Sequence, residues 1–186
     1  MWRLNKAEER RTDLGVSRDG VHWRFFADRQ WYLNNGGEFA GKPIVEALSV
    51  YGLIRRGDQI WQYATYGSSP HSGGDRTVRL IQRLDGFVSL DAGDTPGYLA
   101  TKPLVFAGNQ LSLNIHAAGE ARVGILDKHS KPLRGFATAD CDAIQGDSVR
   151  RVVTWNGQSN VGALAGKVVR LRVELQNTKL YAFQFQ

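Results

Sequence analysis

Short apolar runs alternate with polar breaks along almost the whole chain of 186 residues. The stretch VSRDGVHW, residues 16–23, is typical, because Asp19-Gly20 separates a segment that begins with Val16 from one that ends with Trp23. Asp-Gly accepts the positive φ angles of tight turns, so this stretch predicts a β-hairpin. Similar runs predict three further strands, at residues 44–56, 58–66 and 76–84.

The strand predicted at residues 58–66 is apolar or aromatic on both of its faces. Successive side chains of a strand point to opposite sides. The residues on one side are Ile60, Gln62, Ala64 and Tyr66, and those on the other are Trp61, Tyr63 and Thr65. Aromatic residues on both sides suggest a strand that is covered on both faces.

A segment rich in glycine and proline, residues 84–97, separates the chain into two predicted domains, 1–85 and 86–186. Beyond it, runs such as LSLNI, VVRLRVEL and YAFQF keep the period of two that marks a sheet with one buried face. About seven short strands without a helical pattern predict an antiparallel β-sandwich, jelly-roll-like in type. The expected fold class is therefore all-β.

Charge and cysteine content remove several function classes. The chain carries 24 basic and 18 acidic side chains, a net charge of +6, but the arginines are scattered as on a solvated strand face. We therefore do not expect nucleic acid as a partner. The single cysteine, Cys141, excludes an internal disulfide and a cysteine-based zinc site. Nucleophile-elbow, phosphate-loop, dinucleotide-binding and HExxH motifs do not occur in the sequence.

The N-terminal residues MWRLNKAEERR are charged and lack the apolar centre of a secretory signal. No apolar run reaches the roughly 20 residues that span a bilayer. The sequence therefore predicts a soluble, cytoplasmic protein without a membrane partner, an expectation that depends on the absence of an upstream extension.

Several segments in order carry a family resemblance: VSRDGVHW, GEFAGKPI, GLIRRGDQIWQYATYG and RLDGFVSLDAGD, followed by GDSVRRVVTW and LAGKVVRLRVEL. The series resembles the C-terminal part of five-bladed β-propeller glycosidases of the glycoside hydrolase family 32 and 43 type, which end in a β-sandwich. The resemblance implies partial β-propeller blades in residues 1–85 and a sandwich in 86–186. Too few strands are present to close a ring, so we expect the first half to be covered by the sandwich and by a second copy in a homo-oligomer.

The resemblance implies a carbohydrate-active protein that acts on, or binds, a glycan or a small glycoside. Two alternatives stay open: a non-catalytic carbohydrate-binding module and a structural assembly piece. Members of the family take their acid and nucleophile carboxylates mainly from early blades, which this chain does not include. Ala40 in GEFAG is a further departure, since relatives tend to carry an acidic residue there.

Glycoside hydrolysis needs two carboxyl groups about 5–10 Å apart, and Glu38 and Glu46 are the best candidates in the first half. Glu38 follows a glycine-rich entry, and Glu46 lies in an apolar run where burial would raise its pKa. The alternative is that Glu38 is a solvated turn residue and Glu46 pairs with Arg55. The resemblance implies His71 as a third site residue, whereas its loop position is also that of an exposed histidine.

Five aromatic residues form a candidate sugar platform, because apolar sugar faces stack on flat rings. These residues are Trp31, Tyr32, Trp61, Tyr63 and Tyr66. The alternative for Trp61 is a place in the core between sheets.

The acidic cluster TADCDAIQGDS contains Asp140, Asp142 and Asp147. Carboxylates at close spacing suit calcium, so a structural calcium ion is the one cofactor considered. The alternative, which we prefer, is that these aspartates support turns by binding their own backbone.

Overall fold

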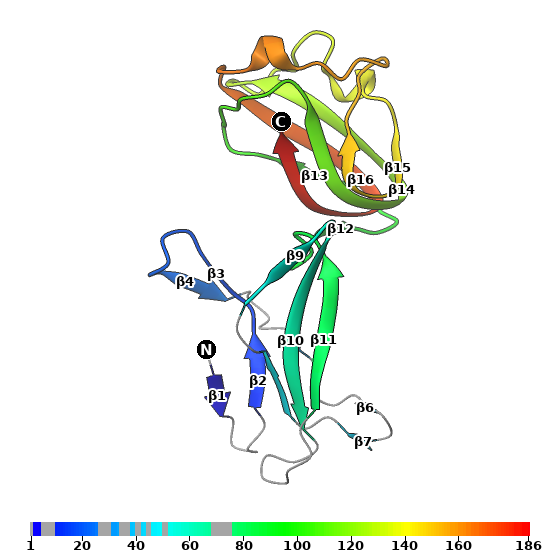
Figure 1. Ribbon diagram of the computed structural model, residues 1–186. Coiled ribbons are helices and arrows are strands. Elements are labelled where there is room, and N and C mark those ends of the chain that lie inside the picture. Colours follow the sequence, from blue (N-terminus) through cyan, green and yellow to red (C-terminus); the bar gives the residue numbers. More distant parts are fainter. Residues whose placement is uncertain are drawn as a thin grey trace. The chain divides into compact units, whose positions relative to one another are not determined.

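The computed structural model describes residues 2–4, 10–25, 31–33, 38–39, 42–43, 46–49, 52–67 and 76–186. Within these ranges the regular elements are strands and two short 3-10 turns, without an α-helix, so the all-β prediction is confirmed. The chain divides into two compact units, Met1–Gln82 and Arg83–Gln186 (Figure 1). No helix in the described ranges has the length and apolar character needed to cross a membrane.

Among its described residues, unit 1 (Met1–Gln82) contains a seven-stranded sheet. Its main path is β1 (Trp2–Leu4), β2 (Arg10–Asp13), β8 (Glu46–Ser49), β10 (Gln59–Gly67) and β11 (Arg76–Arg83), with β5 (Trp31–Leu33) beside β2 and β9 (Ile54–Arg56) beside β10. Two separate two-stranded sheets pair β3 (Gly15–Ser17) with β4 (Trp23–Phe25) and β6 (Glu38–Phe39) with β7 (Lys42–Pro43). A propeller blade has four strands, so this sheet does not by itself establish a propeller.

Strand β10 is buried on one face and open on the other. Ile60, Gln62 and Ala64 are 7%, 5% and 0% exposed, whereas Tyr63 between them is 36% exposed. The predicted alternation is therefore correct, but the expected cover on both faces is not found among the described residues. The face that carries Trp61 and Tyr63 is the open one.

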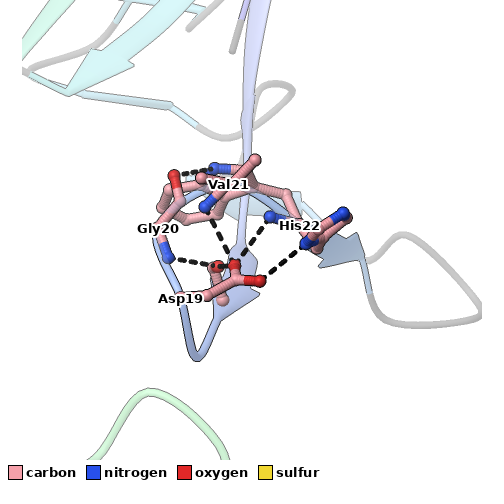
Figure 2. A network of polar contacts seen from close by, with 6 residues as sticks. Asp19, Gly20, Val21 and His22 are labelled. Atoms are coloured by element: carbon pink, nitrogen blue, oxygen red, sulfur yellow. Dashed lines mark hydrogen bonds and ion pairs between the residues drawn. The ribbon is translucent and has the colours of Figure 1, made fainter.

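The β3–β4 hairpin follows the prediction for residues 16–23 and is held by one carboxylate. One oxygen of Asp19 accepts the backbone N–H groups of Val21 and His22 at 2.9 and 2.8 Å, and the other lies 2.6 Å from Nδ1 of His22 (Figure 2). The Ser17 hydroxyl donates to Asp19 and accepts the N–H of Gly20, whose φ is 76°. The hydrogen bonds from His22, and then those from Val21 and Ser17, hold the pKa of Asp19 well below its usual range.

Unit 2 (Arg83–Gln186) is one five-stranded antiparallel sheet. The order is β12 (Leu90–Ala92), β16 (Val169–Phe185), β14 (Leu111–Asp127) and β15 (Ile144–Val152), and β13 (Gly97–Ala100) also pairs with β16. Strands β14 and β16 have 17 residues each and curl into a half-barrel (Figure 1). Their register shifts between Ala117 and Glu120, where irregular pairing lets a long strand bend.

The core of unit 2 lies on the inner side of this curl. Inward residues of the two long strands, among them Leu113, Ile125 and Leu171, are fully buried. The indole of Trp155, 2% exposed, closes the core and donates from Nε1 to the carbonyl of Val123 at 2.8 Å. One curled sheet therefore encloses the core, while the predicted sandwich of two facing sheets remains a prediction.

The Asp19 network gives a first testable prediction. Replacing Asp19 by alanine removes the acceptor of two backbone N–H groups, so hydrogen exchange at Val21 and His22 should accelerate roughly five-fold for each bond lost. Because the folded pKa is depressed, wild-type protection should persist above the ordinary carboxyl pKa of about 3.9 and disappear as the pH falls through the folded value. Exchange measured by NMR tests both statements.

Asp19→Asn is the matched control, since its amide oxygen can still accept the backbone bonds. Equal exchange rates in wild type and Asp19→Ala would show that the turn does not depend on this carboxylate.

Candidate ligand-binding surface

The open face of β9, β10 and β11 carries the most distinctive chemistry of unit 1. Antiparallel pairing sets Arg56 opposite Gln59 and Ile54 opposite Trp61, so these four side chains share one face. Strand β11 lies next to β10 and contributes to the same face. We name this face the aromatic–arginine surface; its residues are Ile54, Arg56, Gln59, Trp61, Tyr63, Arg79 and Ile81.

Trp61 is the centre of the surface. The guanidinium carbons of Arg79 and Arg56 lie 4.2 and 5.1 Å from the centroid of its ring, within the distance of a cation–π interaction. Its indole Nε1–H donates to the side-chain oxygen of Gln59 at 3.0 Å. Trp61 is therefore partly buried and contacts the guanidinium groups of Arg56 and Arg79. Its ring is not the free aromatic platform that the sequence predicts.

The rim of the surface is apolar and accessible. Ile54 and Ile81 are 47% and 50% exposed, and Tyr63 offers an open phenol ring. Within the part of the chain that the structure describes, neither Arg56 nor Arg79 is within ion-pair distance of a carboxylate. The surface thus combines hydrogen-bond donors, positive charge and flat apolar area.

A polar network on the opposite face of β10 supports the surface. The hydroxyl of Tyr32 donates to the side-chain oxygen of Gln82 at 2.7 Å and accepts from the amide of Gln62, which is buried. Burial raises the pKa of Tyr32, although the hydrogen bonds with Gln62 and Gln82 oppose this shift. Tyr32 therefore links β5 to β10 and β11 and fixes which side of β10 faces outward.

Tyr66 is not part of the surface. Its side chain packs against the small cluster of Leu33 and Ala64, and burial raises its pKa. Since Trp61 and Tyr63 lie on the other face, the structure does not bring together the three β10 aromatics that the sequence groups as one platform.

The remaining predicted site residues of unit 1 are not described at side-chain level. Glu38 and Glu46 lie in β6 and β8, and Trp31 lies in β5, but only their strands are described. His71 lies outside the described residues. Their catalytic and binding roles stay predictions.

In unit 2, Asp140 and Asp142 support turns. Asp140 accepts the backbone N–H of Ala137 at 3.0 Å, and Asp142 accepts that of Gly157 at 2.9 Å. A side-chain hydrogen bond from Thr154 and then the Gly157 bond lower the pKa of Asp142. Both contacts are those of the turn-support alternative.

Asp147 has different partners. Its carboxylate lies 2.5 Å from Nη1 of Arg83 and 3.5 Å from Nδ1 of His116, and Arg83 also donates to Asn114. Burial opposes ionisation of Asp147, but the hydrogen bond and charge of Arg83 lower its pKa. The structure does not bring Asp140, Asp142 and Asp147 together, and a search of the described residues finds no acidic, histidine or cysteine trio able to hold a metal.

The thiol of Cys141 is a structural group. It is 1% exposed, accepts the N–H of Val123 at 3.2 Å and has a pKa raised by burial. A buried thiol with a raised pKa is unsuited to nucleophilic chemistry.

The sequence contains both arginines of the surface, but arginines scattered in this way predict a solvated strand face. The segment RRGDQIW contains the two-residue turn Gly57-Asp58, which sets Arg56 opposite Gln59 and thus on the side of Trp61. The position of Arg79 needed the lateral pairing of β11 with β10, for which the sequence contains no comparable marker.

Searches of protein-family models, curated proteins and solved structures find no match to this chain. A function for this chain is therefore inferred from the chemistry of the aromatic–arginine surface and from the family resemblance of its sequence.

The Tyr32 network gives a second testable prediction. Tyr32→Phe leaves the buried amide of Gln62 without its acceptor, so the free energy of unfolding should fall by about 1–3 kcal/mol. The folded pKa of Tyr32 is raised, so its contribution is complete below about pH 10 and is lost as the pH rises through the folded value. Urea unfolding followed by tryptophan fluorescence, at neutral and alkaline pH, measures both effects.

Tyr63→Phe removes the same hydroxyl on the open face and should change the free energy of unfolding by less than about 0.5 kcal/mol. Identical urea midpoints for the two variants would contradict the supporting role of Tyr32.

Proposed function

We propose that this chain is a carbohydrate-active protein that binds a glycan or small glycoside through the aromatic–arginine surface. The observation that carries the proposal is the open face of β10, where Trp61 and Tyr63 lie beside Arg56 and Arg79. Sugars present apolar C–H patches and many hydroxyl groups, and this surface offers partners for both.

Each part of a sugar has a partner on the surface. The C–H face of a ring can pack on the phenol of Tyr63 and on the exposed methyl groups of Ile54 and Ile81. Hydroxyl groups can accept from the two guanidinium groups, which have donors to spare. The site lies on a sheet face and contacts a ligand from one side, so its affinity for a single sugar unit should be modest.

The family resemblance extends this proposal to a glycosidase-type protein, with propeller blades in unit 1 and a sandwich in unit 2. Glu38 and Glu46 are then the proposed carboxyl pair, with His71 beside them. A non-catalytic carbohydrate-binding module needs only the surface. Hydrolysis of a bound glycoside distinguishes the glycosidase from the non-catalytic binding module.

A role in assembly is the second candidate, and the β3–β4 hairpin favours it. Val21 and Trp23 on this hairpin are 74% and 59% exposed, and Val16, which pairs with Arg24 and faces the side opposite to Trp23, is 46% exposed. Large exposed apolar side chains are typical of protein–protein contacts. We propose that a second copy of the chain covers this hairpin in a homo-oligomer.

The glycan proposal predicts binding that depends on the surface aromatics. Trp61→Ala should weaken binding to the best ligand of a glycan array about ten-fold or more, because Trp61 also positions both arginines. Tyr63→Ala should weaken it less. Isothermal titration with the full chain measures both effects.

Tyr98→Ala in β13 is the matched control: Tyr98 is also exposed, at 64%, and carries Arg172 over its ring at 4.3 Å, but it belongs to unit 2. Binding that Tyr98→Ala abolishes and Trp61→Ala leaves intact would refute the proposed site. Release of chromophore from a bound glycoside, lost in Glu38→Gln and Glu46→Gln, supports the hydrolase version, and binding without release supports the module.

The assembly proposal predicts a mass in solution of two or more chains, measured by light scattering after size exclusion. Val21→Lys combined with Trp23→Lys should yield a single chain, because charge on the hairpin opposes burial. The control is Val105→Lys, at an exposed valine of unit 2. A wild-type mass of one chain at micromolar concentration would rule out this assembly.

A further inference from the structure

We propose that the aromatic–arginine surface selects acidic glycans, whose carboxylate or sulfate groups bind the guanidinium groups of Arg56 and Arg79. This inference deepens the proposed function and rests on it. Its basis is the arrangement of two guanidinium groups over one indole.

Stacking on Trp61 prepares both arginines for an anion. A guanidinium that lies over an aromatic ring uses its plane for the ring, while its N–H donors point outward in that plane. Those donors form a fork that matches the two oxygens of a carboxylate or sulfate. Because the indole is fixed by its hydrogen bond to Gln59, the side chains of Arg56 and Arg79 are held before the ligand arrives.

The positive charge of the aromatic–arginine surface is not paired with a carboxylate among the described residues. In the described part of unit 1, neither Arg56 nor Arg79 has a carboxylate partner, although both side chains are exposed. An anionic ligand would supply that partner, and the charge-assisted hydrogen bonds it forms are about twice as strong as neutral ones. A neutral sugar would leave the charge of both guanidinium groups uncompensated.

The same surface is less suited to nucleic acid. Single strands bind by stacking successive bases on free aromatic faces beside a long basic groove. Here the ring of Trp61 is already occupied by guanidinium groups, and the acidic Asp58 lies in the adjoining turn between β9 and β10. Among the described residues of this surface, the positive charge comes from one arginine pair and does not form the long basic groove that a single strand needs.

The test compares acidic glycans with their neutral counterparts, using the full chain and isothermal titration. The probes are galacturonic acid oligosaccharides against the same oligosaccharides with reduced carboxyl groups, and dextran sulfate against dextran. We expect at least about ten-fold tighter binding to one acidic member, the effect of one well-formed charged contact. Whether the uronate or the sulfate binds tells which acidic group the site takes.

Arginine variants locate the selectivity. Arg56→Gln and Arg79→Gln should each remove most of the acidic preference, and Arg79→Lys should restore only part of it, because lysine keeps the charge but not the fork. Arg134→Gln is the matched control, with the same change of net charge at an exposed arginine of unit 2.

Each other outcome overturns the inference. Equal binding of acidic and neutral glycans would remove the selectivity and leave glycan binding intact. Absence of binding to any glycan would remove the proposed function as well. If Arg134→Gln lost the preference for acidic glycans to the same extent, the preference would result from the net charge of the chain and not from this surface. If the chain bound only a single-stranded RNA oligomer, and Arg79→Gln abolished that binding, the surface would be a nucleic-acid site.

Discussion

Strand β10 has only one face that the rest of unit 1 buries, and the candidate surface depends on this constraint. Ile60, Gln62 and Ala64 are turned inward, and the Tyr32 hydroxyl satisfies the polar member of the three. Since side chains alternate strictly, burying this set forces Trp61 and its neighbours outward. Burial of the inner face therefore determines which side chains β10 exposes.

Unit 2 encloses its hydrophobic core with one bent sheet. Two long strands bend at an interruption of their register, so a single sheet wraps the core that two flat sheets would otherwise enclose. Trp155 completes the core from a connecting loop, and Arg83 engages Asn114 and Asp147 at the first residue of the unit. Of the three aspartates near Cys141, Asp140 and Asp142 accept backbone N–H groups in turns, and Asp147 forms an ion pair with Arg83.

Local pattern was enough to predict the all-β class, the hairpin around Asp19-Gly20 and the alternation along residues 58–66. These features depend on the residues of a turn and on the two-residue period of a strand, and both are determined by residues that are close together in the sequence. The curl of β14 and β16 and the place of Arg79 beside Trp61 depend on pairing between distant segments. The aspartates near Cys141 are close in sequence, but the backbone turns each carboxylate toward a different partner.

The turn Gly57-Asp58 joins β9 to β10 with only two residues, and Gly57 adopts a φ of 60°. A loop this short leaves no slack, so the pairing of the two strands is fixed by its length. One inserted amino acid would shift β9 by a single step and exchange the sides on which Arg55 and Arg56 project. The face that Ile54 and Arg56 share with Trp61 therefore depends on the length of this turn as much as on the residues themselves.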